Sequence, residues 1–212
     1  MSLRVTEIFH SLQGEGLDTG LPTTFVRLTG CPLRCSYCDT TYAFKGGRNM
    51  APEAVCRTVQ QFGCRRVTLT GGEPLAQKQA FDLVRMLCDQ GHSVAVETSG
   101  AVDIAPLDSR ARVVMDIKTP ASGEAHRNLW QNLQRLRPQD QLKFVICNRD
   151  DYLWSREQLH RRHLQSHCTV LFSPAWDRLE PTQLAEWILE DGLEVRFQLQ
   201  LHKVLWGEEP GR

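Results

Sequence analysis

The sequence has no excess of charge of either sign and no long hydrophobic run. Its 212 residues contain 25 Lys plus Arg and 25 Asp plus Glu, so the formal net charge is +0. This balance argues against a protein whose main function is to bind duplex DNA or an anionic membrane. No apolar run reaches the roughly 18 residues that a membrane span requires, so we expect neither nucleic acid nor a membrane among the partners.

A secretory signal, a low-complexity stretch and an obvious linker are also missing. The first residues, 1–7, lack a basic region followed by an apolar one, so we expect a cytoplasmic protein. Hydrophobic residues make up 41% and charged residues 24%, which is typical of a folded protein, and we expect a single domain over 1–212. In a reducing compartment the 8 cysteines indicate metal ligands, redox groups or buried apolar residues rather than disulfides.

Short β-branched runs alternate with amphipathic stretches along most of the chain. The candidate strands are 23–28, 66–70, 93–97, 112–117, 141–146, 168–172 and 194–198. The candidate helices are 51–62, 77–89, 124–137, 152–165 and 180–190. This alternation predicts an α/β fold with a parallel sheet, either doubly wound or a barrel, and about six units are fewer than the eight of a full barrel. Residues 4–16 precede the repeat and predict an added strand and loop.

Chemically distinctive residues follow five of these candidate strands. They are Cys31, the segment 71–74, the segment 98–100, Lys118 and the pair Ser173-Pro174. The carboxyl ends of parallel strands are the edge at which α/β proteins bind ligands. The sequence therefore predicts an enzyme with its site at this edge.

Three cysteines, Cys31, Cys35 and Cys38, fall within one short loop. Soft thiolates this close together select zinc or an iron–sulfur cluster. A closed structural zinc site needs four protein ligands, whereas three leave a position open for chemistry. His10 could complete a zinc site, so a structural zinc remains an alternative, as does chance clustering.

Three histidines, His160, His163 and His167, fall on one face of a candidate helix. They could hold a metal ion, but Arg161 and Arg162 flank them and no carboxylate joins the face. A solvated helix face is the favoured interpretation.

The cysteine loop and a glycine-rich segment together resemble the radical S-adenosylmethionine (SAM) superfamily. The loop has the spacing C-x-x-x-C-x-x-C with Tyr37 before its last cysteine, and Thr70-Gly71-Gly72-Glu73-Pro74 matches the superfamily's glycine-rich segment. The resemblance implies that the three cysteines hold a [4Fe–4S] cluster whose fourth iron binds SAM. Glycine suits the second segment because it lets backbone approach a ligand closely.

The N-terminal segment narrows the resemblance to the 7-carboxy-7-deazaguanine synthase family. It is carried by the segments 9–16, 24–28 and 38–40 and by the tail 198–203. It implies a partial (β/α) barrel of about six parallel strands with a substrate-binding extension over 1–22. It also implies conversion of 6-carboxy-5,6,7,8-tetrahydropterin to 7-carboxy-7-deazaguanine with loss of ammonia. That reaction begins when a 5′-deoxyadenosyl radical takes hydrogen from C6, and it serves the pathway to 7-deazapurines such as queuosine of tRNA.

The same resemblance implies a set of site residues. Cys31, Cys35 and Cys38 would ligate the cluster, and Thr40 would hold Mg²⁺ with substrate oxygens and water. The residues implied to contact SAM are Tyr37, Cys38, Asp39, Gly72, Gly100, Asp116, Ile117, Lys118, Ser173, Pro174, Ala175 and Trp176. The residues implied to bind the substrate are Leu12, Gln13, Gly14, Glu15, Arg27 and Thr98, with Arg27 on the substrate carboxylate. The implied partners are the small pterin, an electron donor such as flavodoxin or ferredoxin, and a second copy of the chain.

Simpler structural interpretations exist for several of these residues. Arg27 could be a solvent-facing strand residue, Gln13 an ordinary loop residue and Thr40 a turn hydroxyl. Lys118 could be surface charge, and Asp116 could be its buried partner. The tail 207–212 receives no role.

Two other functions remain as alternatives at this point. One is a radical SAM activase that takes hydrogen from a glycine of a partner protein. The other is a zinc or iron–sulfur module with a structural or sensing role. A small polar anion as substrate, which Gln13, Glu15 and Arg27 would suit, favours the synthase over the activase. The five strand-end motifs in one chain argue against the structural or sensing module.

Overall fold

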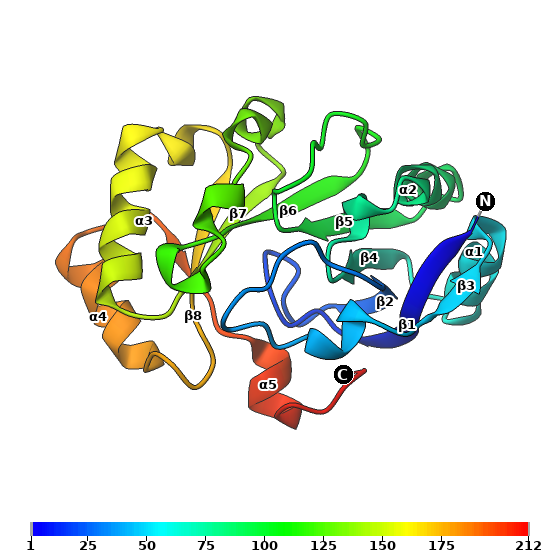
Figure 1. The fold of residues 1–212 in the computed structure, drawn as a ribbon, viewed down its shortest axis with the longest axis horizontal. Helices are drawn as coiled ribbons and strands as arrows, with labels where there is room; N and C mark the ends of the chain where they lie inside the picture. Colours follow the sequence, from blue (N-terminus) through cyan, green and yellow to red (C-terminus); the bar gives the residue numbers. More distant parts are fainter. Residues whose placement is uncertain (1, 212) are drawn as a thin grey trace.

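A computed structural model describes residues 2–211 of the chain. In this part the strands form a nine-stranded sheet in the order β3-β1-β2-β4-β5-β6-β7-β8-β9 (Figure 1). The strands are β1 (Leu3–Leu12), β2 (Pro22–Leu28), β3 (Arg48–Met50), β4 (Arg66–Gly71), β5 (Ser93–Thr98), β6 (Arg112–Ile117), β7 (Gln141–Ile146), β8 (Thr169–Pro174) and β9 (Arg196–Phe197). Neighbours run parallel from β2 across to β9, whereas β1 is antiparallel to both β2 and β3.

The sheet is strongly curved but open, because β3 and β9 lie at its two edges. This confirms the partial barrel of parallel strands and the added N-terminal strand. Strands β2 and β4 to β8 match six of the predicted segments to within two residues. The seventh predicted strand, 194–198, is reduced to the two residues of β9, and β3 was not predicted.

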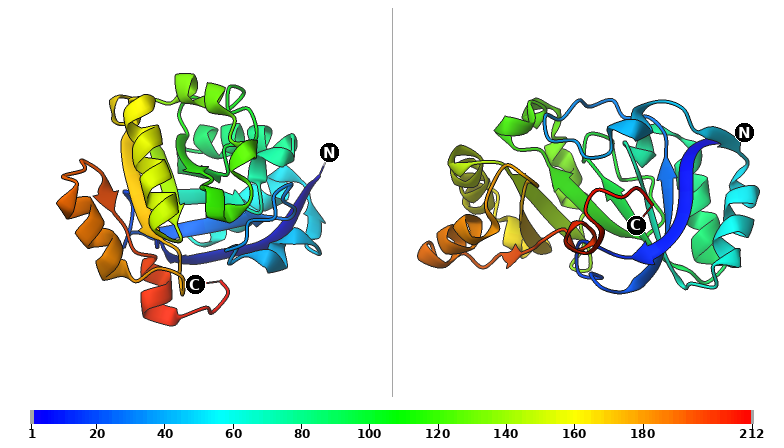
Figure 2. Two further views of the ribbon diagram at one scale, coloured as in Figure 1. Left: turned by 60° about the vertical axis from the view of Figure 1, so that its left-hand side comes forward. Right: turned by 90° about the horizontal axis from the view of Figure 1, so that it is seen from below.

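The longer helices lie on the outer side of the curved sheet (Figure 2). The helices are α1 (Pro52–Gln61), α2 (Gln79–Asp89), α3 (Arg149–Arg161), α4 (Pro181–Glu190) and α5 (Leu201–Trp206). Helix α3 begins three residues earlier than predicted because the Asn148 side chain caps it, accepting a hydrogen bond from the Asp151 N–H at 2.9 Å. The short helix α5 was not predicted. Within residues 2–211 no helix is both long and apolar enough to cross a membrane.

The helix predicted over 124–137 is wrong. The segment forms short 3₁₀ turns at Ala125–Arg127 and Trp130–Arg135 instead. The side chain of Asn128 bonds the backbone of Lys118 in both directions, and that of Asn132 bonds backbone groups of the loop after β5. These amides tie the segment to two strand ends, and such tertiary bonds override the helical spacing of its leucines.

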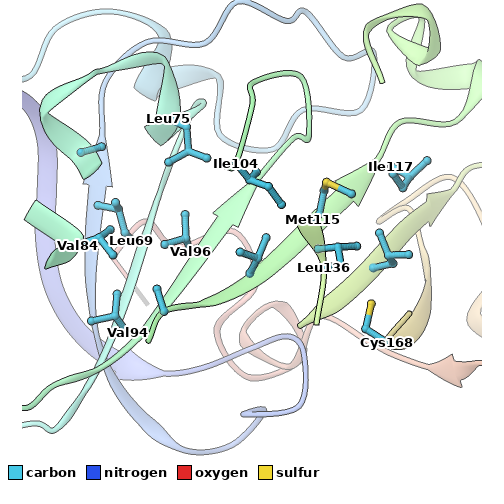
Figure 3. Close-up of a cluster of buried hydrophobic side chains, with 14 of the residues drawn as sticks. Leu69, Leu75, Val84, Val94, Val96, Ile104, Met115, Ile117, Leu136 and Cys168 are labelled. Carbon is cyan, nitrogen blue, oxygen red and sulfur yellow. The ribbon is translucent and has the colours of Figure 1, made fainter. Parts of the chain in front are cut away.

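The hydrophobic core fills the space between the outer face of the sheet and the helices. Figure 3 shows part of it, where Leu69 of β4 and Val96 of β5 lie toward Val84 of α2 and Met115 of β6 lies farther along the sheet, each at most 1% exposed. Burying one such side chain stabilises the fold by about 1.5–3 kcal/mol. Because successive strand residues face opposite sides, the neighbours of these core residues face the inner side of the sheet.

Candidate active site

A cavity of about 630 Å³ lies on the inner side of the sheet. Its walls come from the cysteine loop, from the inner faces of the strands and from the loops that follow β4, β5, β6 and β8. Nearly all the predicted site residues line it: Leu12, Gln13, Gly14, Glu15, Arg27, Cys31, Cys35, Tyr37, Cys38, Asp39, Thr40, Gly72, Thr98, Asp116, Lys118, Ser173, Pro174, Ala175 and Trp176. The fold thus gathers into one space residues that lie up to 164 positions apart, from Leu12 to Trp176.

Two residues expected at the SAM site, Gly100 and Ile117, lie behind this wall. Ile117 is 2% exposed and belongs to the core, because it faces the side of β6 opposite to Asp116. Gly100 has φ +70° and is covered by Met115, and its carbonyl accepts a hydrogen bond from Asn132 Nδ2 at 3.1 Å. Neither residue therefore presents a side chain to the cavity, and their contacts with SAM stay a prediction.

The cysteine loop is fastened to its surroundings through its own backbone. The Ser36 N–H donates to the carbonyl of Ser122 at 3.0 Å, and the guanidinium of Arg178 donates to Ser36. Gly72 packs directly against this loop, since a Cβ there would lie 2.4 Å from the carbonyl oxygen of Gly30 and 2.7 Å from Cys31 Cβ. A residue other than glycine would push the loop away, which explains the glycine-rich segment.

The three thiols fit a cluster better than a single ion. Burial raises the pKa of Cys35 to about 11 and raises those of Cys31 and Cys38. A neighbouring thiol adds to the rise at Cys31 and Cys35, and Asp39 adds to it at Cys38. The Lys118 ammonium opposes this shift at all three. Yet within residues 2–211 no three His, Cys, Asp or Glu side chains converge closely enough to hold one metal ion. Three thiols from one short loop on one cavity wall, with no fourth cysteine among the described residues that line it, are a donor set that suits three irons of a [4Fe–4S] cluster.

The histidines offered as other metal ligands do not join this site. His10 is exposed and stacks on Phe62, with ring centroids 5.9 Å apart, and it does not line the cavity. His160 and His163 lie at a separate surface hollow beside the end of α3, and His167 is not among the residues that line it.

Two buried polar atoms of the cavity wall have no partner in the described chain. They are Asp116 Oδ1 and the Tyr37 hydroxyl. The other carboxylate oxygen, Asp116 Oδ2, lies 3.1 Å from Lys118 Nζ, so Lys118 is a buried partner of Asp116 and not surface charge. Unpaired polar atoms on a cavity wall are what a polar ligand would satisfy, and this part of the wall fits SAM.

The loop between β1 and β2 supplies the opposite wall. Gln13 is 6% exposed, and its amide donates to Glu97 Oε1 and Thr68 Oγ1, each at 3.2 Å, so it is not an ordinary loop residue. Glu15 Oε2 accepts from Lys143 Nζ at 2.7 Å, and Glu15 Oε1 accepts from Gln200 Nε2 at 2.9 Å. Burial opposes the charge of Glu15, but Lys143, His202 and Gln200 together outweigh it and lower the Glu15 pKa.

Arg27 faces the cavity and not bulk solvent. Its Nε lies 2.7 Å from Glu7 Oε1, and its guanidinium lies over the rings of Phe9 and Tyr42 at 5.9 and 5.8 Å. Of the three guanidinium nitrogens of Arg27, only Nε has a hydrogen-bond partner within residues 2–211, so the two terminal nitrogens are available to a ligand. A planar fork held in this way suits a carboxylate.

Two threonines of the predicted site differ in what their hydroxyls do. Thr40 Oγ1 donates to Asp39 Oδ1 at 2.9 Å, which leaves the oxygen lone pairs of Thr40 for a cation. Burial opposes the charge of Asp39, but Lys203 and the Thr40 bond lower its pKa to about 2. Thr98 Oγ1 instead donates to Glu73 at 2.9 Å, so its proton is already engaged within the protein.

Sequence reasoning missed several polar residues of the wall. Glu97 and Lys143 line the cavity from the middle of strands, and Glu73 supports it from behind. Burial, and then the charge of Glu15, raises the pKa of Glu97. The signal for the first two was a charged residue inside an otherwise apolar strand. Gln200, His202 and Lys203 from the tail also line the cavity, as do residues 207–211, whereas Arg212 lies outside the described residues.

Comparison with known proteins gives consistent results. The family model of the radical SAM superfamily matches residues 25–121. A 7-carboxy-7-deazaguanine synthase from Chlorobaculum tepidum is 40% identical over 210 residues, covering 98% of this chain and 96% of that one. One from Thermoplasma acidophilum is 37% identical over 209 residues, covering 98% and 99%. The crystal structure of QueE from Escherichia coli superposes with a TM-score of 0.79 and 25% identity over 95% of each chain.

Proposed function

This chain belongs to the 7-carboxy-7-deazaguanine synthase family of radical SAM enzymes, and from that premise we propose how its cavity performs the reaction. It is a lyase that uses a [4Fe–4S] cluster and SAM, acts on a small molecule and needs a reductant. Its substrate is 6-carboxy-5,6,7,8-tetrahydropterin, and the products are 7-carboxy-7-deazaguanine and ammonia. The observation that carries this proposal is the single cavity, which has three thiols on one wall and Gln13, Glu15 and Arg27 on another.

The wall around the cysteine loop holds the cofactors. When bound, the reduced cluster and SAM supply the 5′-deoxyadenosyl radical that takes hydrogen from C6 of the substrate. Cys31, Cys35 and Cys38 ligate the cluster, and Gly72 lets the backbone approach SAM. The remaining SAM contacts come from Tyr37, Asp39, Gly100, the segment 116–118 and the segment 173–176. Lys118 offsets the negative charge that the thiolates bring, and Asp116 Oδ1 accepts a donor of the ligand.

The wall around the β1–β2 loop orients the substrate. The backbone of Leu12 and Gly14 and the amide oxygen of Gln13 meet the pterin edge, and the ionised Glu15 accepts its N–H donors. The Gln13 NH₂ is already bonded to Thr68 and Glu97. Arg27 binds the 6-carboxylate with the two nitrogens that Glu7 leaves available. Thr98 lies close by, with its hydroxyl oxygen as an acceptor.

Thr40 is proposed to hold Mg²⁺ at the junction of the two walls. Support comes from its hydroxyl proton, which points to Asp39 and so leaves lone pairs for a cation. One hydroxyl is a weak site alone, and it suits Mg²⁺ because that ion keeps waters and shares substrate oxygens.

The wider setting follows from the same chemistry. We place the whole chain in one radical SAM domain, with 1–22 as the substrate-binding extension. The reduced cluster calls for an electron donor such as flavodoxin or ferredoxin and for a reducing compartment, the cytoplasm. A homodimer and a product used for 7-deazapurines, queuosine among them, complete the proposal.

Equilibrium binding of a fluorescent analogue, 6-carboxypterin, tests the substrate wall without turnover. Arg27→Gln should weaken its binding by about 30- to 100-fold, the equivalent of about 2–3 kcal/mol for a charge-assisted pair. Pterin without the 6-carboxylate is the matched control ligand, and its binding should change little. Equal losses for both ligands would show that Arg27 does not bind the carboxylate.

A further inference from the structure

Lys143 occupies an unusual place on the inner face of β7. Its Nζ lies 2.7 Å from Glu15 Oε2 and 3.6 Å from Asp116 Oδ2, so one half-buried ammonium stands between two carboxylates. Burial opposes its charge, but Glu15, Asp116 and Glu97 together raise its pKa, so the ammonium keeps its proton. Glu15 belongs to the proposed substrate wall, whereas Asp116 belongs to the proposed SAM wall.

The same face of β7 holds the substrate loop at a second point. Gln141, two positions before Lys143, accepts a hydrogen bond from the Leu17 N–H at 2.9 Å through its Oε1. A Cβ on Gly16 would lie 2.8 Å from that same oxygen, so the loop is packed closely against the strand. Strand β7 therefore fixes both the backbone of this loop and the side chain of Glu15.

We propose that Lys143 is a positioning residue, which fixes the ionised Glu15 carboxylate for pterin binding and links it to Asp116 on the SAM wall. The inference rests on the proposed role of Glu15 at the pterin. The groups that face Glu15 are Lys143, Glu97, Gln198, Gln200 and His202. Without Lys143, the half-buried Glu15 would face the like charge of Glu97, and its pKa would rise toward proton uptake. A protonated carboxyl would then present a donor to the N–H donors of the pterin.

Binding of 6-carboxypterin to four variants separates this role from a purely structural one. In Lys143→Met, binding should weaken by about tenfold or more, which corresponds to the loss of one charge-assisted hydrogen bond. This loss of affinity should be larger near pH 5.5 than near pH 7.5. Lys143→Arg keeps the charge and should restore most of the affinity. In an anaerobic turnover assay with 6-carboxy-5,6,7,8-tetrahydropterin as substrate, Lys143→Met should raise KM more than it lowers kcat.

The Glu15→Gln background supplies the matched control. Adding Lys143→Met to Glu15→Gln should change the affinity by less than about twofold, because the carboxylate that Lys143 positions is already gone. In Lys143→Met the Glu15 carboxylate loses its counter-ion, whereas the double variant has no carboxylate at position 15. The double variant can therefore be compared with Glu15→Gln even if Lys143→Met alone folds poorly. A pH effect that persists in the Glu15→Gln background does not come from Glu15 and would count against this role of Lys143.

Two further results would overturn the inference. One is wild-type affinity in Lys143→Met, and the other is an equally large loss when the same change is made in Glu15→Gln. If the wild-type protein itself does not bind 6-carboxypterin, the cavity is not the pterin site, and the proposed function of its substrate wall fails with the inference. Failure of the proposed function is therefore seen in the wild-type protein, whereas failure of the Lys143 inference is seen only in the variants.

Discussion

Glu73, which lies behind the cavity wall, should be a costly carboxylate to remove. It is 0% exposed and accepts hydrogen bonds from the Ser99 N–H at 2.7 Å and the Leu75 N–H at 3.0 Å. It also accepts from the hydroxyls of Thr98 at 2.9 Å and Ser99 at 2.5 Å. One side chain thus joins the loop after β4, which carries the glycine-rich segment, to the loop after β5.

The size of the effect follows from the donors left behind. Glu73→Ala strands two buried backbone N–H groups, at about 1–3 kcal/mol each, while the two hydroxyls can rotate to other acceptors. We therefore expect the free energy of unfolding to fall by about 3–5 kcal/mol. Glu73→Gln retains one oxygen, but its NH₂ must face either Leu75 N–H or Ser99 N–H, so one bond is lost whichever way the amide is turned. A loss of about 1–3 kcal/mol is expected for that variant.

Urea unfolding of the cluster-free protein, followed by circular dichroism, measures both variants. Glu186→Gln on the exposed side of α4 is the matched control, and its effect should stay within about 0.5 kcal/mol. The reasoning would be refuted by a loss below about 1 kcal/mol in Glu73→Ala, or by wild-type stability in Glu73→Gln.

Two further predictions concern Gly72, which packs against the cysteine loop, and Glu97 of β5. In Gly72→Ala the new Cβ would meet the carbonyl oxygen of Gly30 at 2.4 Å, so iron bound per chain after anaerobic reconstitution should fall. Gly63→Ala strains the backbone, since Gly63 has φ +63°, but its Cβ would have nothing within 4 Å, so it controls for strain away from the cysteine loop and should keep its iron. Equal iron contents in the two variants would contradict this. The Glu97 pKa is raised by burial and by Glu15, so the stability that its proton provides is present below the unfolded value of 4.5 and lost as pH rises through the folded pKa. Glu97→Gln should therefore become more stable relative to wild type as pH rises, and a pH-independent difference in urea unfolding would count against it.

The strands and the cysteine site were predictable because their signals are local. Short β-branched runs located β6 and β7 at their observed bounds, and residues at strand ends must meet at one edge of a parallel sheet. The helix predicted over 124–137 failed because Asn128 and Asn132 bond to distant strand ends, which no local pattern reveals.

The charged residues of the inner wall depended on contacts across the sheet. Lys143 becomes a partner of Glu15 only when the β1–β2 loop crosses β7, a contact between residues 128 positions apart. Ile117 illustrates the converse, since its place beside Asp116 and Lys118 suggested a ligand contact but strand alternation turns it into the core. The tail 207–211 carries no pattern that would place it at the cavity.

Anaerobic turnover tests the central claim most directly. The reconstituted protein is given dithionite, SAM, Mg²⁺ and 6-carboxy-5,6,7,8-tetrahydropterin, and the products are identified by mass. We expect the wild-type protein to form 7-carboxy-7-deazaguanine in excess of the SAM consumed, and we expect Cys35→Ala to form no 7-carboxy-7-deazaguanine. Accumulation of 5′-deoxyadenosine without the deazapurine would contradict the proposed substrate and favour an activase. Neither product from an iron-loaded protein would contradict the assignment of this cavity as the active site.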